Sequence, residues 1–352
     1  MLELIASNSL FATLAVVCGI FALAGGGEVL VRGAVKIALG LRISPLVVGL
    51  TIVALCTSAP EMAVSFSAAL QGDPSVADVA LGNVVGSNIC NILLILGVCA
   101  LIRPLKTSES IVKRDFPFCL AISIVTLLVA LSCSDESRRF FLPQWYGFAL
   151  IITFIAYEFI VIKRARREEN AQYAASVAET NIPGAGKIDA QTAPEPLSAP
   201  TLSNWLLASL QILIGLALLV VGARAFVDGS VSIARSLGVS ELVIGLTLVA
   251  IGTSLPELTV SAIATFRNSP DVAMGNVVGS NISNLLFILG VTLAALPKGL
   301  AVQPQSAFVD IPVMIAAVAI ASWFSLSERV LSRGEGAILL LGQFGYAAYL
   351  IL

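Results

Sequence analysis

The amino-acid sequence predicts an all-α membrane protein with about ten transmembrane helices, built as two inverted-topology five-helix repeats with proline-broken helices at the midplane. Three observations lead to this prediction. The chain of 352 residues is 57% hydrophobic and only 12% charged, whereas soluble domains are about 45–50% apolar and about 25% charged. Its apolar residues form runs long enough to cross a bilayer. Two distant parts of the chain also share most of their polar residues.

The apolar runs set the expected number of spans, because a helix needs about 20 residues to cross the hydrocarbon core. Such runs lie near residues 9–31, 44–70, 77–101, 116–133, 143–162, 204–226, 241–266, 272–296, 307–326 and 336–352. The long polar stretch 164–203 begins with clustered charges and later carries prolines, so we expect a flexible loop there. It separates a first five-helix repeat, residues 1–163, from a second, residues 204–352.

Lysine and arginine residues predict the orientation, because cytoplasmic segments carry an excess of both. With the N-terminus placed outside, the inside segments hold 15 of the 20 basic residues and the outside segments hold five. We therefore expect both termini outside and the 164–203 loop in the cytoplasm.

Residues 44–70 and 240–266 are related copies, with 15 of 27 aligned positions identical. The relation resumes in 78–98 and 271–291, where 17 of 21 positions are identical. Each copy starts a five-helix half, and because five is odd, the second half enters the membrane from the opposite side. Inverted repeats of this kind point to secondary transporters with a site at the repeat interface. A duplicated bundle without a transport role is the alternative.

Glu61 and Glu257 occupy equivalent positions in these copies, each near the middle of an apolar run. Glu61 is the only charged residue between Arg42 and Asp73, and no lysine, arginine or histidine lies near either glutamate in the sequence. A carboxylate at this depth costs a few kcal/mol even on lenient insertion scales, and such residues mark ion pathways. The pair therefore predicts cation ligands. A protonated glutamate that is hydrogen-bonded inside the bundle is the structural alternative.

A proline precedes each glutamate, within Thr57-Ser58-Ala59-Pro60-Glu61 and Thr253-Ser254-Leu255-Pro256-Glu257. Proline removes a backbone hydrogen bond inside a helix, so Pro60 is expected to free the carbonyl of Cys56, and Pro256 that of Gly252. Free carbonyls, hydroxyls and a carboxylate are hard oxygen ligands, which suit Na⁺ or Ca²⁺.

The second repeated motif is Gly-Asn-Val-Val-Gly-Ser-Asn-Ile-x-Asn, which starts at Gly82 and recurs later in the chain. Its serine and last asparagine are four residues apart and share one helix face; they are Ser87 and Asn91, and then Ser280 and Asn284. We predict that these last asparagines are ligands, and that the other asparagines of the motif make hydrogen bonds between helices.

Together these motifs resemble the α-repeats of the cation/Ca²⁺ antiporter superfamily, and most of all the compact prokaryotic sodium/calcium exchangers. At motif level the resemblance covers residues 44–98 and 240–291. It implies ten helices around a cluster of cation sites at the midplane, which Na⁺ and Ca²⁺ occupy alternately. It also implies that the first and sixth helices slide across the rest, with Gly25–Gly27 and Gly222 serving that motion.

The resemblance also implies a ligand set, with two of its members acting through their backbone carbonyls. These residues are Ala54 (carbonyl), Thr57, Ser58, Glu61, Ser87 and Asn91 in the first half, and Ala250 (carbonyl), Thr253, Ser254, Glu257, Ser280 and Asn284 in the second. The glutamates would bind Ca²⁺, and the flanking groups would complete Na⁺ sites. Some relatives carry Asp where this chain has Asn284, which leaves the ion stoichiometry open. Cys56 also replaces the glycine that is usual before Thr57.

Composition excludes other functions. The chain has no histidine, which removes histidine-based catalytic triads and histidine metal sites, and its net charge of −2 does not favour nucleic acid. Its six cysteines form no C-x-x-C pair and predict buried small hydrophobic residues. We therefore expect a Na⁺/Ca²⁺ antiporter in a prokaryotic inner membrane, with lipid and inorganic cations as its partners and no cofactor, catalytic activity or obligatory protein partner. A H⁺/Ca²⁺ or other cation exchanger is the alternative, and an intramembrane enzyme or a channel is more remote.

Overall fold

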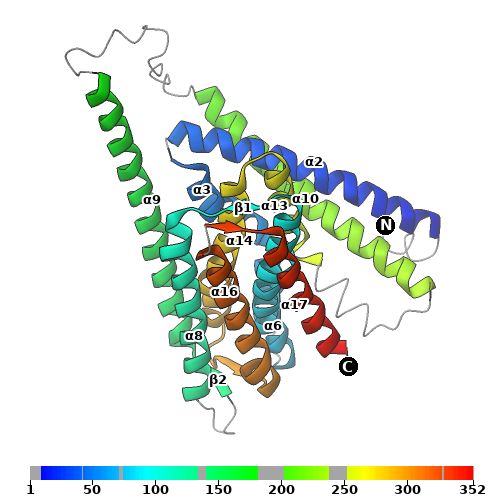
Figure 1. The fold of residues 1–352 in the computed structure, drawn as a ribbon. Helices are drawn as coiled ribbons and strands as arrows, with labels where there is room; N and C mark the ends of the chain where they lie inside the picture. Colours follow the sequence, from blue (N-terminus) through cyan, green and yellow to red (C-terminus); the bar gives the residue numbers. More distant parts are fainter. Residues whose placement is uncertain are drawn as a thin grey trace.

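The computed structural model describes residues 9–41, 43–70, 74–133, 140–180, 202–237, 252–326 and 329–351. Nearly all of these residues are helical, which confirms the predicted all-α class. Figure 1 shows a bundle of steep helices with two long helices crossing it at an angle.

The described helices of the second half follow the same order along the chain as their counterparts in the first half. The symbol η denotes a π-helical turn. The first half contains α2 (Ser9–Leu41), α3 (Pro45–Val48), η1 (Gly49–Val53), α4 (Ala54–Thr57), α5 (Ala59–Leu70), α6 (Pro74–Cys90), η2 (Asn91–Ile95), α7 (Leu96–Ile102), η3 (Ile111–Asp115), α8 (Phe116–Ser132) and α9 (Gln144–Thr180). The second half contains α10 (Leu202–Ser236), α13 (Leu255–Phe266), α14 (Pro270–Ser283), η5 (Asn284–Ile288), α15 (Leu289–Ala294), η6 (Ser306–Asp310), α16 (Ile311–Leu326) and α17 (Arg333–Ile351).

Each of the ten predicted apolar runs contains at least part of a helix. Among the described residues, seven helices are long and apolar enough to cross a membrane, and an eighth span arises if the bent pair Pro45–Thr57 and Ala59–Phe66 is counted as one. Helix α13 is short, and residues 238–251, which precede it, lie outside the described residues. The count of ten spans therefore stays a prediction.

Two spans form the centre of the bundle. In Ala80–Ile102 and Pro270–Ala294, 72% and 83% of the most apolar window is buried, against 33% in each of the other five long spans. These central spans carry the repeated asparagine motifs. Because they are surrounded by protein, their polar side chains must find partners inside the bundle.

Helix α9 extends beyond the predicted span. We expected a flexible loop over 164–203, but α9 continues to Thr180 and α10 begins at Leu202. Residues 164–180 are rich in alanine, arginine and glutamate and contain neither glycine nor proline, and these residue types favour a helix. Arg164 and Arg167 are exposed, but exposure does not end a helix, and the prolines begin only at Pro183. Residues 181–201 lie outside the described residues.

Two short antiparallel strand pairs, which the sequence did not predict, connect the halves. Strand β1 (Leu105–Lys106) pairs with β4 (Val330–Leu331), and β2 (Phe140–Leu142) pairs with β3 (Leu300–Val302). Each pair thus joins a loop of one half to a loop of the other. The two pairs lie at opposite ends of the bundle (Figure 1).

Helices α2 and α10 run antiparallel, side by side (Figure 1). Three glycines in each helix recur every seven residues, at 19, 26 and 33 in α2 and at 215, 222 and 229 in α10. A Cβ atom on Gly222 would lie 3.0 Å from the carbonyl oxygen of Gly19, and one on Gly229 would lie 2.6 Å from the carbonyl oxygen of Ala12. Small residues at such spacing let helix backbones approach closely. The two helices therefore form one tightly packed pair.

A polar cluster joins this pair to the rest of the bundle. Glu28 of α2 accepts hydrogen bonds from Arg32, at 2.5 Å, and from Nε of Arg267, at 3.0 Å. Arg267 lies in the turn between α13 and α14, and the next residue, Asn268, accepts a hydrogen bond from Arg103 at the end of α7. The turn therefore contacts both α2 and the central span.

Alanine substitutions test the packing of the α2–α10 pair. A Cβ on Gly26 would lie 2.8 Å from Cβ of Leu218 and 2.9 Å from the carbonyl oxygen of Gly215. We expect Gly26→Ala to lower the free energy of unfolding by about 1–3 kcal/mol through overpacking. The control is Gly25→Ala, because a Cβ there meets no atom within 4 Å. Thermal unfolding in detergent measures both variants, and equal melting temperatures would contradict the close approach.

Candidate functional site

The two proline-containing motifs interrupt their helices at equivalent positions. The ψ angle is 8° at Ser58 and 4° at Ser254, instead of about −42° in an α-helix. The first break bends the span by 44°. New helices begin directly after these serines, and each carries its glutamate in the first turn, Glu61 in α5 and Glu257 in α13. Negative charge is favoured there because the N-terminal end of a helix is positive.

The two glutamates point toward each other's half. Ser58 of the first half donates a hydrogen bond to Oε1 of Glu257 at 2.9 Å, and Ser254 of the second half donates to Oε1 of Glu61 at 3.4 Å. Ser87 also donates to Oε1 of Glu61, at 3.5 Å. Glu61 is 1% exposed and Glu257 is 0% exposed. Each half therefore supplies a hydroxyl to the buried carboxylate of the other.

Asparagine side chains hold the broken helices against the central spans. Asn83 donates to the backbone carbonyl of Glu61 at 3.0 Å and to Ser65 at 2.9 Å. Asn276 makes the equivalent contacts, to the backbone carbonyl of Glu257 at 3.3 Å and to Ser261 at 2.9 Å. These are the hydrogen bonds between helices that the sequence predicted for the remaining asparagines. They set the position of each glutamate backbone.

The predicted ligands Asn91 and Asn284 each begin a π-helical turn, η2 and η5. Such a turn widens the helix locally, and π-turns of this kind are frequent at functional sites. The sequence did not predict them, because neither position is followed by a proline or glycine at the turn.

Several buried oxygen atoms of the site lack a hydrogen-bond partner among the described residues. They are Oε2 of Glu61, Oε2 of Glu257, Oδ1 of Asn91, Oδ1 of Asn284 and Oγ1 of Thr253. Buried polar atoms are nearly always paired, so a bound ion or water would satisfy these unpaired oxygens. No described lysine or arginine forms an ion pair with either glutamate. Carboxylate, amide and hydroxyl oxygens without a neighbouring base suit hard cations such as Na⁺ and Ca²⁺.

Hydrogen bonds join most of the predicted ligands directly. Besides the contacts of the glutamates, the carbonyl oxygen of Ala54 accepts from Ser280 at 3.5 Å and from Thr57 at 3.3 Å. That carbonyl also accepts the Ser58 backbone N–H at 3.0 Å, so it is not freed by the break. Thr57 donates to Oδ1 of Asn276 at 3.1 Å as well. Thr253 precedes the second break, and Ala250 lies outside the described residues.

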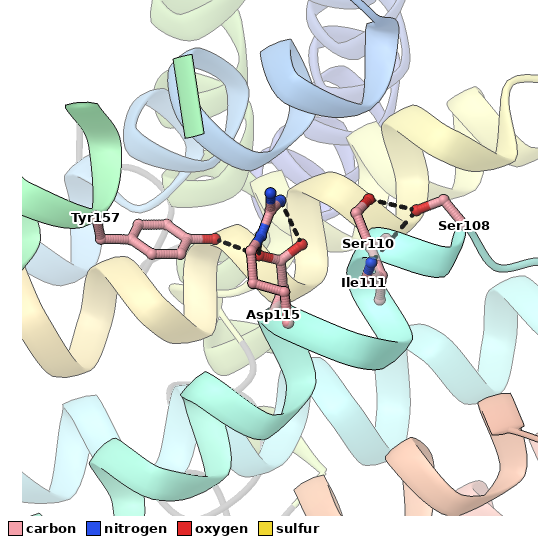
Figure 2. A network of polar contacts seen from close by, with 6 residues as sticks. Ser108, Ser110, Ile111, Asp115 and Tyr157 are labelled. Carbon is pink, nitrogen blue, oxygen red and sulfur yellow. Dashed lines mark hydrogen bonds and ion pairs between the residues drawn. The ribbon is translucent and has the colours of Figure 1, made fainter. Parts of the chain in front are cut away.

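A duplicated aspartate clamp away from these motifs was missed. Figure 2 shows Asp115, at the end of η3, beside Tyr157 of α9, whose hydroxyl donates a hydrogen bond to it at 3.0 Å. Arg114 donates two further hydrogen bonds to Asp115, at 2.7 and 3.0 Å. Asp310, at the end of η6, accepts from Tyr346 of α17 at 3.1 Å. The clamps tie α8 to α9 and α16 to α17. The sequence carries a signal for them, since Asp-x-Pro occurs once in each half, at 115–117 and 310–312.

Comparison with known proteins places this geometry in context. A family model described as sodium/calcium exchanger protein matches residues 11–163 and 207–352. The chain is 38% identical to the putative antiporter CaxA of Alkalimonas amylolytica, over 96% of this chain and 98% of that protein. It is 33% identical to the sodium/calcium exchanger MaX1 of Methanosarcina acetivorans, over 95% and 96% of the two chains. A solved structure of the sodium-calcium exchanger NCX_Mj covers 97% of this chain and 100% of its own, with a TM-score of 0.76 at 27% identity.

Removing one site carboxylate tests whether the unpaired oxygens bind a cation. A ligand at a hundred times its Kd stabilises the folded state by about 2.7 kcal/mol, so Ca²⁺ is expected to raise the melting temperature of the unaltered protein. Glu257→Gln is expected to abolish that rise. Glu158→Gln is the matched control, because Oε1 of Glu158 is also buried and unpaired but belongs to α9. A full Ca²⁺-dependent rise in the Glu257→Gln variant would contradict the site.

Proposed function

The chain belongs to the sodium/calcium exchanger family, and we propose that it is a secondary antiporter that exchanges Na⁺ for Ca²⁺ by alternating access. One observation carries the proposal: Glu61 and Glu257, from opposite halves, lie buried in one hydrogen-bonded cluster, and each leaves an oxygen unpaired. A catalytic activity is not part of the proposal, since the family consists of exchangers.

Charge balance explains why one site serves two cargoes. Two ionised carboxylates neutralise either one Ca²⁺ or two Na⁺, and without a cation they repel each other in a medium of low dielectric constant. Both ions prefer oxygen ligands, so they compete for the same carboxylates. Binding of one ion therefore displaces the other, which is the basis of exchange.

We propose that the predicted ligands have different roles in binding Ca²⁺ and Na⁺. Glu61 and Glu257 bind Ca²⁺ directly, and Asn91 and Asn284 contribute their unpaired amide oxygens. The Na⁺ sites are completed at the two breaks by the hydroxyls of Thr57, Ser58, Thr253 and Ser254 and the backbone carbonyls of Ala54 and Ala250. The hydroxyls of Ser87 and Ser280, in the central spans, complete the set. Asn284 adds no third negative charge, so more than two bound Na⁺ would leave the site positive.

The access change follows from an inverted arrangement of the halves, which we include in the proposal. Strand β1 follows the asparagine-motif span of the first half and β3 follows that of the second, yet these strands lie at opposite ends of the bundle (Figure 1). The reciprocal contacts of Ser58 and Ser254 support a twofold relation. The glycine-packed α2–α10 pair is then the unit that slides across the site, exposing it first to one side and then to the other.

The proposed location is a prokaryotic inner membrane, with both termini outside and the segment between α9 and α10 in the cytoplasm. Contacts among the described residues support a common end for the segments predicted to be inside. Arg267 binds Glu28, Arg103 binds Asn268, and Arg329 forms an ion pair with Glu109 at 3.2 Å. The last two contacts join predicted inside segments to one another, and Glu28 lies three residues from the predicted inside end of the first apolar run.

Transport in liposomes tests the coupling ion. Liposomes that contain the purified protein and are loaded with Na⁺ are expected to take up ⁴⁵Ca²⁺ as Na⁺ leaves down its gradient. A pH gradient alone is expected to drive no uptake. Glu61→Gln and Glu257→Gln are expected to lower the uptake rate to background, because each removes half of the charge that binds Ca²⁺. Uptake that follows only the pH gradient would establish a H⁺/Ca²⁺ exchanger instead, and unchanged uptake in either variant would exclude the site.

Labelling of single cysteines tests the orientation. Lys106 in β1 and Lys298 beside β3 are exposed and lie at the two strand pairs. In a cysteine-free background, we expect a membrane-impermeant maleimide added to intact cells to label Lys298→Cys and to spare Lys106→Cys. Both are expected to react in opened membranes. The reversed pattern would invert the proposed topology, and labelling of both in intact cells would exclude opposite ends.

A further inference from the structure

Asn88 and Asn281 lie at the centre of the bundle and contact each other across the two halves. Nδ2 of Asn88 donates to the backbone carbonyl of Asn281 at 3.4 Å, and Nδ2 of Asn281 donates to the backbone carbonyl of Asn88 at 3.2 Å. Both side chains are fully buried. No role beyond a hydrogen bond between helices follows for them from the sequence.

These backbone contacts determine how each amide is oriented. A carbonyl oxygen can only accept a hydrogen bond, whereas an asparagine side chain carries a donor at one end and an acceptor at the other. The NH₂ group of Asn88 must therefore face the carbonyl of Asn281, and the reverse holds for the partner. Each Oδ1 then points away from that contact and is available as an acceptor.

The two available acceptors bind the predicted ligand asparagines. Oδ1 of Asn281 accepts a hydrogen bond from Nδ2 of Asn91 at 3.0 Å, and Oδ1 of Asn88 accepts one from Nδ2 of Asn284 at 3.2 Å. The amide nitrogen of each ligand is thereby used, and its own Oδ1 is the end left without a partner. The backbone carbonyl thus fixes the orientation of one asparagine amide, and that amide fixes the orientation of the next.

We propose that Asn88 and Asn281 are positioning residues of the cation site, which force Asn284 and Asn91 to present oxygen rather than NH₂ to the bound cation. The inference rests on the proposed function, because it assumes that the unpaired oxygens bind Ca²⁺ or Na⁺. An amide turned by 180° would place hydrogen atoms with partial positive charge against the cation. Asparagine suits positions 88 and 281, because its side chain carries a donor at one end and an acceptor at the other.

A double-mutant cycle on equilibrium Ca²⁺ binding tests this assignment. Asn88→Leu removes the acceptor of Asn284, and loss of such an outer partner typically lowers metal affinity about 10- to 100-fold. We expect a loss of that size in the otherwise unaltered protein. In the Asn284→Asp background the same substitution is expected to have little effect, because an ionised aspartate presents oxygen in either orientation. The proposal therefore predicts strong non-additivity of the two substitutions.

Met314→Leu is the matched control, since it removes only the Sδ contact that Nδ2 of Asn88 makes at 3.5 Å. Its Ca²⁺ affinity is expected to equal that of the unaltered protein. An equal loss from Asn88→Leu in both backgrounds would show a merely structural role and overturn the proposal, as would unchanged affinity in the first background.

If Asn88→Leu does not fold, the equivalent cycle on the other asparagine pair tests the same positioning role. It combines Asn281→Leu with Asn91→Asp, and the same non-additivity is expected because the contacts of the two halves are reciprocal. Additive losses there would overturn the proposal. An unaltered protein that binds no Ca²⁺ at all would instead refute the proposed function, which keeps the two failures apart.

Discussion

The structure depends on two carboxylates held in the interior of an apolar bundle. A charge at such depth is tolerated only with compensating groups close by. Here the compensation consists of helix N-terminal ends, the hydroxyls of Ser58 and Ser254, and asparagines that hold the backbone of each glutamate. No described basic side chain pairs with either glutamate. The compensation stays incomplete, and the oxygens left over are the ones that we propose to bind a cation.

The two related halves contribute equivalent groups to the proposed site. Each half brings one proline break, one glutamate and one asparagine motif, and neither half completes its own set, since Ser58 serves Glu257 and Ser254 serves Glu61. The proposed site therefore lies at the interface of the two halves. The symmetry is not complete: Thr57 donates to Asn276, whereas the hydroxyl of Thr253 has no partner among the described residues.

Different kinds of contact hold different parts of the bundle together. The aspartate clamps of Asp115 and Asp310 tie neighbouring helices within each half, and the strand pairs join loops of opposite halves at both ends. Helices α2 and α10 instead contact each other through glycines, and a polar cluster around Glu28 joins this pair to the turn between α13 and α14. In the proposed mechanism, the clamped and strand-paired helices hold the ligands, and the α2–α10 pair is the unit that moves.

The sequence alone determined the all-α membrane class, the separation into two related halves, both helix breaks and the central glutamates. These features obey rules that act along the chain: a span needs about 20 apolar residues, proline interrupts a helix, and charge at depth is rare. The prediction of a flexible loop from residue 164 was wrong for residues 164–180, because this polar segment continues helix α9 to Thr180. Only the tertiary structure decided which residues meet. Ser58 and Glu257 are 199 positions apart, and Asn91 and Asn281 are 190 apart. The orientation of an asparagine amide depends on the groups that pack against it, and residue spacing along the chain does not predict those groups.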